Sequence, residues 1–123
     1  MKIFLSANII GVSDVEKASK WYSKIFGMKL VTLKLPHFCH MRLGRNDFLI
    51  EQHSLDRPVG FQNIPTGVRI SAIIGVDDIH KFIKHVKKNK VKIIHEQVKQ
   101  KWGGWNAIIR DPYKNEIIID QDD

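Results

Sequence analysis

The feature that most constrains the fold of this chain is an internal repeat. Residues 9–15 read Ile-Ile-Gly-Val-Ser-Asp-Val and residues 73–79 read Ile-Ile-Gly-Val-Asp-Asp-Ile. A second pair of similar segments lies at the end of each half, with Phe-Leu-Ile-Glu-Gln at 48–52 and Ile-Ile-Ile-Asp-Gln at 117–121. Self-similarity at a fixed spacing indicates a duplicated structural unit. We therefore predict one domain over 1–123 that contains two copies of one unit, at 1–53 and 68–123, with a Pro- and Gly-containing linker at 54–67.

Each copy has the same predicted order of elements. The β-prone residues 3–12 predict a strand, Ser13 or Asp14 is a suitable N-cap, and apolar residues then recur with helical spacing up to Gly27. Three strand-like runs follow. They lie near 28–35, 38–43 and 47–53, and the second copy predicts a strand near 68–76, a helix near 78–89 and strands near 91–98, 104–110 and 115–121. The expected fold class is α+β: two βαβββ repeats that form a curved mixed sheet around a pocket, with the helices outside.

The composition limits which binding partners and which cellular compartment we expect for this chain. Cys39 is the one cysteine, which excludes an intrachain disulfide and a thiolate zinc site and favours a reducing, cytoplasmic location. No apolar run is long enough for a membrane span, and the first residues read as a strand, not as a secretory signal. The net charge is +7, from 20 Lys+Arg against 13 Asp+Glu, which favours anionic partners. Much of this charge lies in 81–92, where the lysines are spaced as the solvated face of an amphipathic helix.

Two motifs resemble those of the vicinal-oxygen-chelate superfamily, which includes glyoxalases, bleomycin-resistance proteins and ring-cleaving dioxygenases. Residues 11–28, Gly-Val-Ser-Asp-Val-Glu-Lys-Ala-Ser-Lys-Trp-Tyr-Ser-Lys-Ile-Phe-Gly-Met, are similar to that family's first helix, which has valine, aspartate two residues later, a paired aromatic and then leucine-glycine. Trp-Gly-Gly-Trp at 102–105, followed by Arg-Asp-Pro-Tyr-Lys-Asn-Glu-Ile at 110–117, is similar to its closing hairpin, although Lys114 replaces the usual glycine. The resemblance spans essentially the whole chain and implies a curved sheet that encloses a pocket.

The resemblance also implies where a metal would be held. Metal-dependent members place one ligand, usually His, Glu or Gln, on each of four strands. Transferred to this sequence, the positions are Ala7, either Leu49 or Glu51, Ser71 and Ile118. Alanine, serine and isoleucine do not replace imidazole and carboxylate ligands. We therefore expect no metal and no other cofactor, as in the metal-free antibiotic-sequestering members.

Alternation along the predicted strands separates a core face from a pocket face. With Phe48, Ile50, Ile117 and Ile119 under the helices, Glu51 and Asp120 point to the pocket side or end at its solvated rim. Arg69 alternates with apolar residues, so it either faces the pocket, where a guanidinium binds a carboxylate or phosphate, or lies at the surface near a strand start. Trp102 precedes two glycines and would either close over a flat ligand or pack in a core or dimer contact.

The hairpin that contains His40 has two alternative registers. If Gly44-Arg45-Asn46 forms the turn, His37 faces His53 and Cys39 faces Glu51, an accidental set of metal-ligand residue types. A slip of one residue instead brings His40 beside Glu51 as a hydrogen-bonded pair, structural or acid–base. At the second hairpin, Pro112 is suited to the first corner of a type I turn, and Asn115 tolerates a left-handed conformation.

These observations support three classes of function. The first is a homodimer that binds a small organic ligand, anionic by overall charge, through His40, Glu51, Arg69, Trp102 and Asp120, without metal. The second is a glyoxalase-like lyase or isomerase, metal-dependent only if the ligand positions are misaligned. The third is a basic interaction module that uses the lysine-rich helix, for which nucleic acid is an unlikely partner because the sequence contains no known nucleic-acid-binding motif. The sequence does not decide whether the repeats pair within one chain or between chains.

Overall fold

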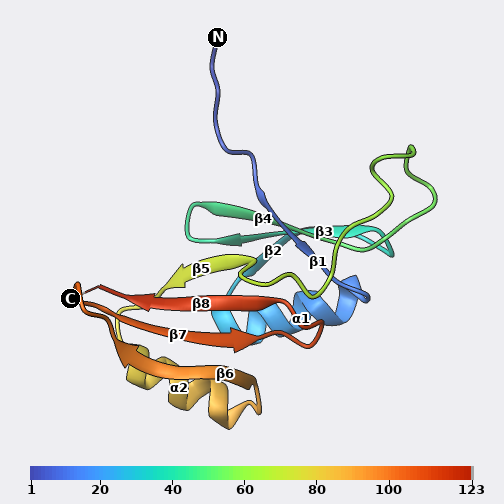
Figure 1. Cartoon of the computed structure of the whole chain (residues 1–123). Helices are drawn as coiled ribbons and strands as arrows, with labels where there is room; N and C mark the ends of the chain where they lie inside the picture. Colours follow the sequence, from blue (N-terminus) through green and yellow to red (C-terminus); the bar gives the residue numbers. More distant parts are fainter. Residues whose placement is uncertain (123) are drawn as a thin grey trace. The chain divides into compact units, whose positions relative to one another are not determined.

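The computed structural model describes residues 1–122, which divide into two compact units, Met1–Thr66 and Gly67–Asp123 (Figure 1). The elements follow one another as β1(Asn8–Gly11), α1(Val15–Phe26), β2(Lys29–Lys34), β3(Phe38–Leu43), β4(Asn46–Glu51), β5(Ala72–Gly75), α2(Ile79–Lys88), β6(Lys92–Lys99), β7(Trp105–Arg110) and β8(Glu116–Gln121). The predicted α+β class and the two βαβββ repeats are confirmed, with one four-stranded mixed sheet in each unit. No helix among residues 1–122 is long and apolar enough to cross a membrane.

Unit 1 packs one helix on one face of its sheet. The strand order is β1-β4-β3-β2, with β1 parallel to β4 and the other pairs antiparallel (Figure 1). Helix α1 begins where Asp14 accepts a hydrogen bond from the Lys17 N–H at 3.0 Å and ends at Gly27, whose φ of 71° is the left-handed conformation that glycine favours. The core lies between this helix and the sheet. It contains Ile10, Val12, Val15, Ala18, Tyr22, Ile25, Met28, Cys39, Met41, Phe48 and Ile50.

Unit 2 repeats this plan. Its strand order is β5-β8-β7-β6, and α2 is capped by Asp78, which accepts a hydrogen bond from the Lys81 N–H at 3.0 Å. Asp78 and Lys81 lie 64 residues after Asp14 and Lys17, the same spacing as in the sequence repeat. The core of unit 2 contains Ile74, Ile79, Ile83, Val86, Ala107, Ile109, Ile117 and Ile119.

The first strand of each unit is shorter than predicted. Strand β1 begins at Asn8 because its partner strand β4 begins at Asn46, where the chain turns; residues 1–7 (blue in Figure 1) lie outside any strand. Strand β5 begins only at Ala72. Ile70 has a φ of 57°, which interrupts an extended chain, so the predicted alternation from 68 onward is wrong.

The turn between β7 and β8 differs from the prediction at one residue. Lys114, not Asn115, has the left-handed conformation, with a φ of 69°. Asn115 is instead fully buried: its side chain donates to the Asp111 carboxylate at 2.9 Å and accepts from the Val68 N–H at 2.9 Å. Lys114 occupies the position of the family's usual glycine, and the geometry explains why glycine suits that position.

Candidate functional site

In each unit the helix leaves one face of the sheet without a helical cover, and we call this the open face. On the open face of unit 2, Ile73, Ile118 and Ile108 are lateral partners on three adjacent strands. Ile73 is 65% exposed, whereas Ile74 and Ile119 on the opposite face are buried in the core. An exposed apolar row across adjacent strands is an unsatisfied surface that a ligand or another protein surface could cover.

A hollow of about 130 Å³ lies on this open face, between β6 and β7. It is lined by His95, Val98, Gln100, Asn106, Ala107 and Ile108. At its polar side the Asn106 amide donates to the Asp120 carboxylate at 2.8 Å. The predicted site residue Asp120 therefore lies beside the hollow, half-buried and already oriented by a neighbour. The mixture of apolar walls and a few oriented polar groups is typical of small-molecule sites.

The loop that carries Trp102 begins at the edge of this hollow. Gln100, which lines the hollow, accepts from the Gly103 N–H at 3.1 Å and donates from its own N–H to the Gly104 carbonyl at 3.0 Å. Both glycines have positive φ angles, 94° and 77°, so the loop makes a tight reversal that residues with side chains adopt only with strain. Trp102 is 81% exposed at the tip. The Trp102 ring does not line the hollow; it stands exposed on the loop that begins there at Gln100.

Arg69 is not brought to this hollow. It is exposed in the turn that precedes β5. In the strand order of unit 2, β5 and β6 form the two opposite edges, three strand spacings apart, or about 14 Å. A ligand in the hollow between β6 and β7 would therefore meet Lys101, which is exposed next to Trp102, before it met Arg69.

The open face of unit 1 carries His40 in a polar cluster with Asp47 and Arg42. The Oδ1 atom of Asp47 accepts from His40 Nε2 at 2.7 Å and from Arg42 Nε at 2.9 Å. The hydrogen bond from His40, followed by that from Arg42, lowers the pKa of Asp47. Because the carboxylate is ionised and accepts, the Nε2 nitrogen of His40 carries the proton. The sequence analysis did not predict a role for Asp47. The available signal was its position at the start of a predicted strand.

Both predicted registers of this hairpin are wrong. The turn contains only Gly44 and Arg45, so Leu43 pairs with Asn46. His40 therefore lies opposite Leu49, and Phe38 lies opposite Glu51. Neither the accidental set of His37, Cys39 and Glu51 nor a His40–Glu51 pair forms.

Glu51 is buried, with an exposed fraction of 4%, and is neutralised by Arg57. The Arg57 guanidinium donates to the Glu51 carboxylate at 3.0 Å from the linker. The linker also lies against Gly11, the lateral partner of Glu51, where an added Cβ would come within 1.8 Å of the Pro65 carbonyl oxygen. The linker thus covers this end of the open face of unit 1. The sequence analysis did not predict Arg57. The available signal was that the Glu51 carboxylate needs a partner if it is buried.

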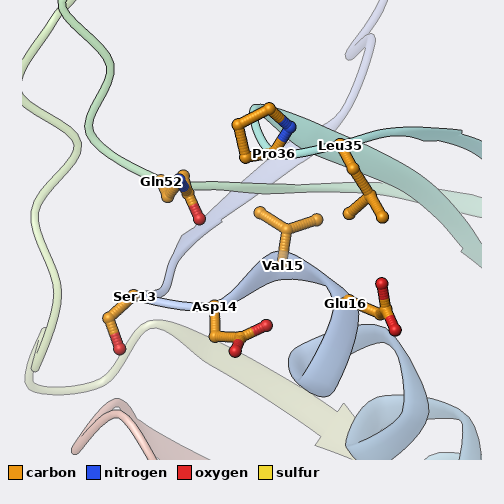
Figure 2. A pocket seen from close by; sticks show the side chains of 7 residues that line it. All are labelled: Ser13, Asp14, Val15, Glu16, Leu35, Pro36 and Gln52. Atoms are coloured by element: carbon orange, nitrogen blue, oxygen red, sulfur yellow. The ribbon is translucent and has the colours of Figure 1, made fainter.

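A larger hollow, of about 280 Å³, lies at the start of α1 (Figure 2). Leu35 and Pro36 lie on one side of Val15, with Asp14 and Glu16 on the other. The Asp14 carboxylate already caps the helix. We assign this hollow no function because its polar groups are explained by the local helix start.

The comparisons with known proteins agree with this fold. The family model described as Glyoxalase/Bleomycin resistance protein/Dioxygenase superfamily matches residues 5–119. The chain belongs to this superfamily. A search of the curated proteins gives no match.

Several solved structures of the superfamily fold are similar to this chain. A superfamily member from Sphaerobacter thermophilus has 17% identity and a TM-score of 0.80, covering 99% of each chain. The lactoylglutathione lyase from Agrobacterium tumefaciens has 15% identity and a TM-score of 0.79, covering 98% of this chain and 94% of its own. TioX from Micromonospora sp. ML1 has 15% identity and a TM-score of 0.75, covering 98% and 97%. At these identities the likeness concerns the fold alone.

The internal repeat resolves which residue of unit 1 occupies the superfamily's metal-ligand position. In unit 2 the ligand position Ile118 pairs laterally with Ile73, whose repeat equivalent in unit 1 is Ile9. The residue that pairs with Ile9 is Leu49, so the equivalent ligand position is Leu49 and not Glu51. The four positions are therefore Ala7, Leu49, Ser71 and Ile118. None offers an imidazole or carboxylate, so these residues do not fit a divalent metal. Among residues 1–122 no group of three or more His, Cys, Asp or Glu side chains could hold a metal ion.

Proposed function

We propose that this superfamily member binds a small, flat organic ligand on the open face of unit 2. The observation that supports this is the hollow between β6 and β7, with Val98 and Ile108 as walls, Asn106 held by Asp120 as a polar contact, and Trp102 beside it. A cavity of about 150 Å³ is sufficient for benzene. The hollow of about 130 Å³ therefore suits one ring, with Trp102 as a cover for its outer side.

The proposed ligand is anionic, and Lys101 is its expected partner. The chain carries an excess of positive charge, and Lys101 is exposed next to Trp102. Asp120 is the competing charge: its carboxylate accepts from the neutral Asn106 amide and keeps its negative charge, so the anionic group of the ligand is expected to lie on the Lys101 side. A ring placed in the hollow would leave a carboxylate substituent on the side of the Trp102 loop.

Benzoate is a suitable probe because it combines one ring with one negative charge. We expect benzoate to raise the melting temperature by binding linkage and to quench tryptophan fluorescence, whereas benzylamine, the matched cation, should bind more weakly. Ile108→Trp should fill the hollow and remove benzoate binding, and Trp102→Ala should weaken it. Arg69→Ala should leave binding unchanged. Equal binding of benzoate to the Ile108→Trp protein would refute this location.

The proposal includes a homodimer without metal. A pair of two-fold related subunits would provide two equivalent ligand sites. Light scattering should give twice the monomer mass of 14.3 kDa. A mass that stays at the monomer value across concentrations would contradict the dimer.

The lysine-rich helix α2 offers a control for diffuse attraction. Lys81, Lys84 and Lys88 are all exposed on it. If benzoate binding depended equally on Lys84 and Lys101 and grew at low salt, it would reflect surface charge instead of a site, and the basic interaction module would replace the ligand-binding reading.

A further inference from the structure

The polar cluster of unit 1 contains a histidine that its counterpart in unit 2 lacks. Arg42 and Asp47 are lateral partners joined by an ion pair, and Arg110 and Glu116 are the equivalent lateral partners, joined at 3.3 Å. A cross-strand ion pair at the same place in both units has a structural explanation.

His40 has no such explanation. The residue at its place in unit 2 is Ile108, because His40 lies opposite Leu49 as Ile108 lies opposite Ile118. Unit 1 therefore adds an imidazole to an ion pair that unit 2 keeps without one.

The imidazole is held with one nitrogen free. Asp47 accepts from Nε2, so Nδ1 carries the lone pair in the neutral ring, and the imidazole makes no other hydrogen bond with residues 1–122. His40 lies on β3, an interior strand of the sheet, with its side chain 27% exposed. On the open face its lateral neighbours are Leu49 on one side, followed by Ile9, which is 56% exposed, and Thr32 of β2 on the other side. A carboxylate-oriented imidazole beside an exposed apolar row is the arrangement of a general base.

We propose that His40 is a general base, oriented by Asp47, that removes a proton from an activated C–H bond of a small uncharged organic molecule bound on the open face of unit 1. This activity is independent of the ligand site of unit 2. The apolar row of Leu49 and Ile9 favours a flat, uncharged substrate.

The proposed step balances without any cofactor. The substrate proton forms a bond to His40 Nδ1, and the electron pair of the broken C–H bond stays on the substrate, where it expels an oxygen leaving group. The imidazolium is paired with the Asp47 carboxylate and returns its proton to water. Arg42 lies on the same face, and its terminal nitrogens make no hydrogen bond with residues 1–122, so they are available to the oxyanion that leaves.

The probe is 5-nitrobenzisoxazole, a flat neutral molecule whose deprotonation breaks its N–O bond and releases a coloured phenolate. We expect the full-length protein to exceed free imidazole at equal concentration by about 100-fold, the lower range for a positioned base. His40→Gln should reduce the rate to that of the uncatalysed reaction in buffer. Asp47→Asn should lower kcat by about tenfold with little change in KM, because the amide no longer fixes the tautomer.

Two matched controls separate this role from a structural one. Glu116→Gln removes the equivalent ion pair of unit 2, where no imidazole is present, and should leave the rate unchanged. His53→Gln removes an exposed histidine outside the cluster and should also have no effect. Nitrogen NMR of the unmodified protein should show the proton of His40 on Nε2, a measurement that needs no variant. A full rate in the His40→Gln protein, a rate no greater than that of free imidazole, or a proton on Nδ1 would each overturn the proposal.

Discussion

Replacement of Gly11 by alanine should destabilise the protein, whereas the same change at its repeat partner Gly75 should not. A Cβ on Gly11 would lie 1.8 Å from the Pro65 carbonyl oxygen, 2.7 Å from the Pro65 carbonyl carbon and 3.0 Å from a methyl carbon of Ile64. Real Cβ atoms essentially never approach other atoms within 3.0 Å, and two of these neighbours are backbone. The linker must therefore move. At Gly75 the nearest atom is the Asp120 carbonyl oxygen at 3.8 Å, an ordinary contact.

The magnitude of each change follows from these distances. Forcing an extra methyl group into a packed position costs about 1–3 kcal/mol. Movement of the linker would also disturb the pairing of Arg57 with Glu51, the buried lateral partner of Gly11. At Gly75 the smaller entropy of the unfolded chain should instead stabilise the protein by about 0.4–1 kcal/mol. The two variants should therefore differ in free energy of unfolding by roughly 1.4–4 kcal/mol.

Urea unfolding monitored by circular dichroism gives the free energies, and limited proteolysis of residues 53–66 reports on the linker. If the linker moves away instead of straining the unit, the Gly11→Ala protein should be cut faster in this segment while its overall stability changes less. A Gly11→Ala protein with the stability and the proteolytic resistance of the unmodified chain would refute the contact between the linker and β1.

Four further predictions concern single residues and metal content. Burial raises the pKa of the Cys39 thiol to about 11, so it should react with thiol reagents only after unfolding, as measured by the rate of absorbance change in native and denatured protein. Lys114→Gly should raise the free energy of unfolding by up to about 1 kcal/mol because it removes a left-handed non-glycine residue; an unchanged urea midpoint would contradict this. The pKa of Asp47 is lowered in the folded state. The Asp47 carboxylate therefore contributes stability above its unfolded pKa, and this stability is lost as the pH falls through the folded pKa. Asp47→Asn should flatten this acid dependence, as measured by thermal melts at a series of pH values. Protein purified without chelators should contain well under one divalent ion per chain by elemental analysis, and a stoichiometric ion would revive a metal-dependent lyase.

Much of the fold could be predicted because its signals are local. The N-cap aspartates and Gly27 mark helix ends through side-chain and backbone chemistry that depends on a few adjacent residues. The identical spacing of Asp14 and Asp78 from the preceding Gly-Val pair then indicated that both halves share one plan. Among the strand boundaries, the starts of β1 and β5 differ most from the prediction, because the length of a strand depends on where its partner turns, and that is not a local property.

The candidate site was less predictable because it depends on register and on a loop. A turn of two residues at Gly44 and Arg45, one fewer than assumed, moved each residue of β3 relative to β4 and gave His40 a different partner. Arg57 reaches Glu51 from an irregular linker whose path no periodicity describes. Of the two positions expected for Arg69, the structure has the exposed one near a strand start, because the positive φ of Ile70 breaks the strand on which the pocket-facing orientation depended.

The two halves of the chain share a backbone plan but differ on their open faces, and this difference supports the choice of unit 2 for ligand binding. The equivalent carboxylates are Glu51 and Asp120, since each lies opposite the glycine of its repeat, Gly11 or Gly75. In unit 1 the linker packs against that glycine, and Arg57 neutralises a carboxylate that is only 4% exposed. In unit 2 the same position is half-exposed and is held by a neutral amide. This end of the sheet in unit 2 is therefore open to a ligand, with the Asn106 amide held beside the hollow, whereas in unit 1 the linker covers the equivalent end.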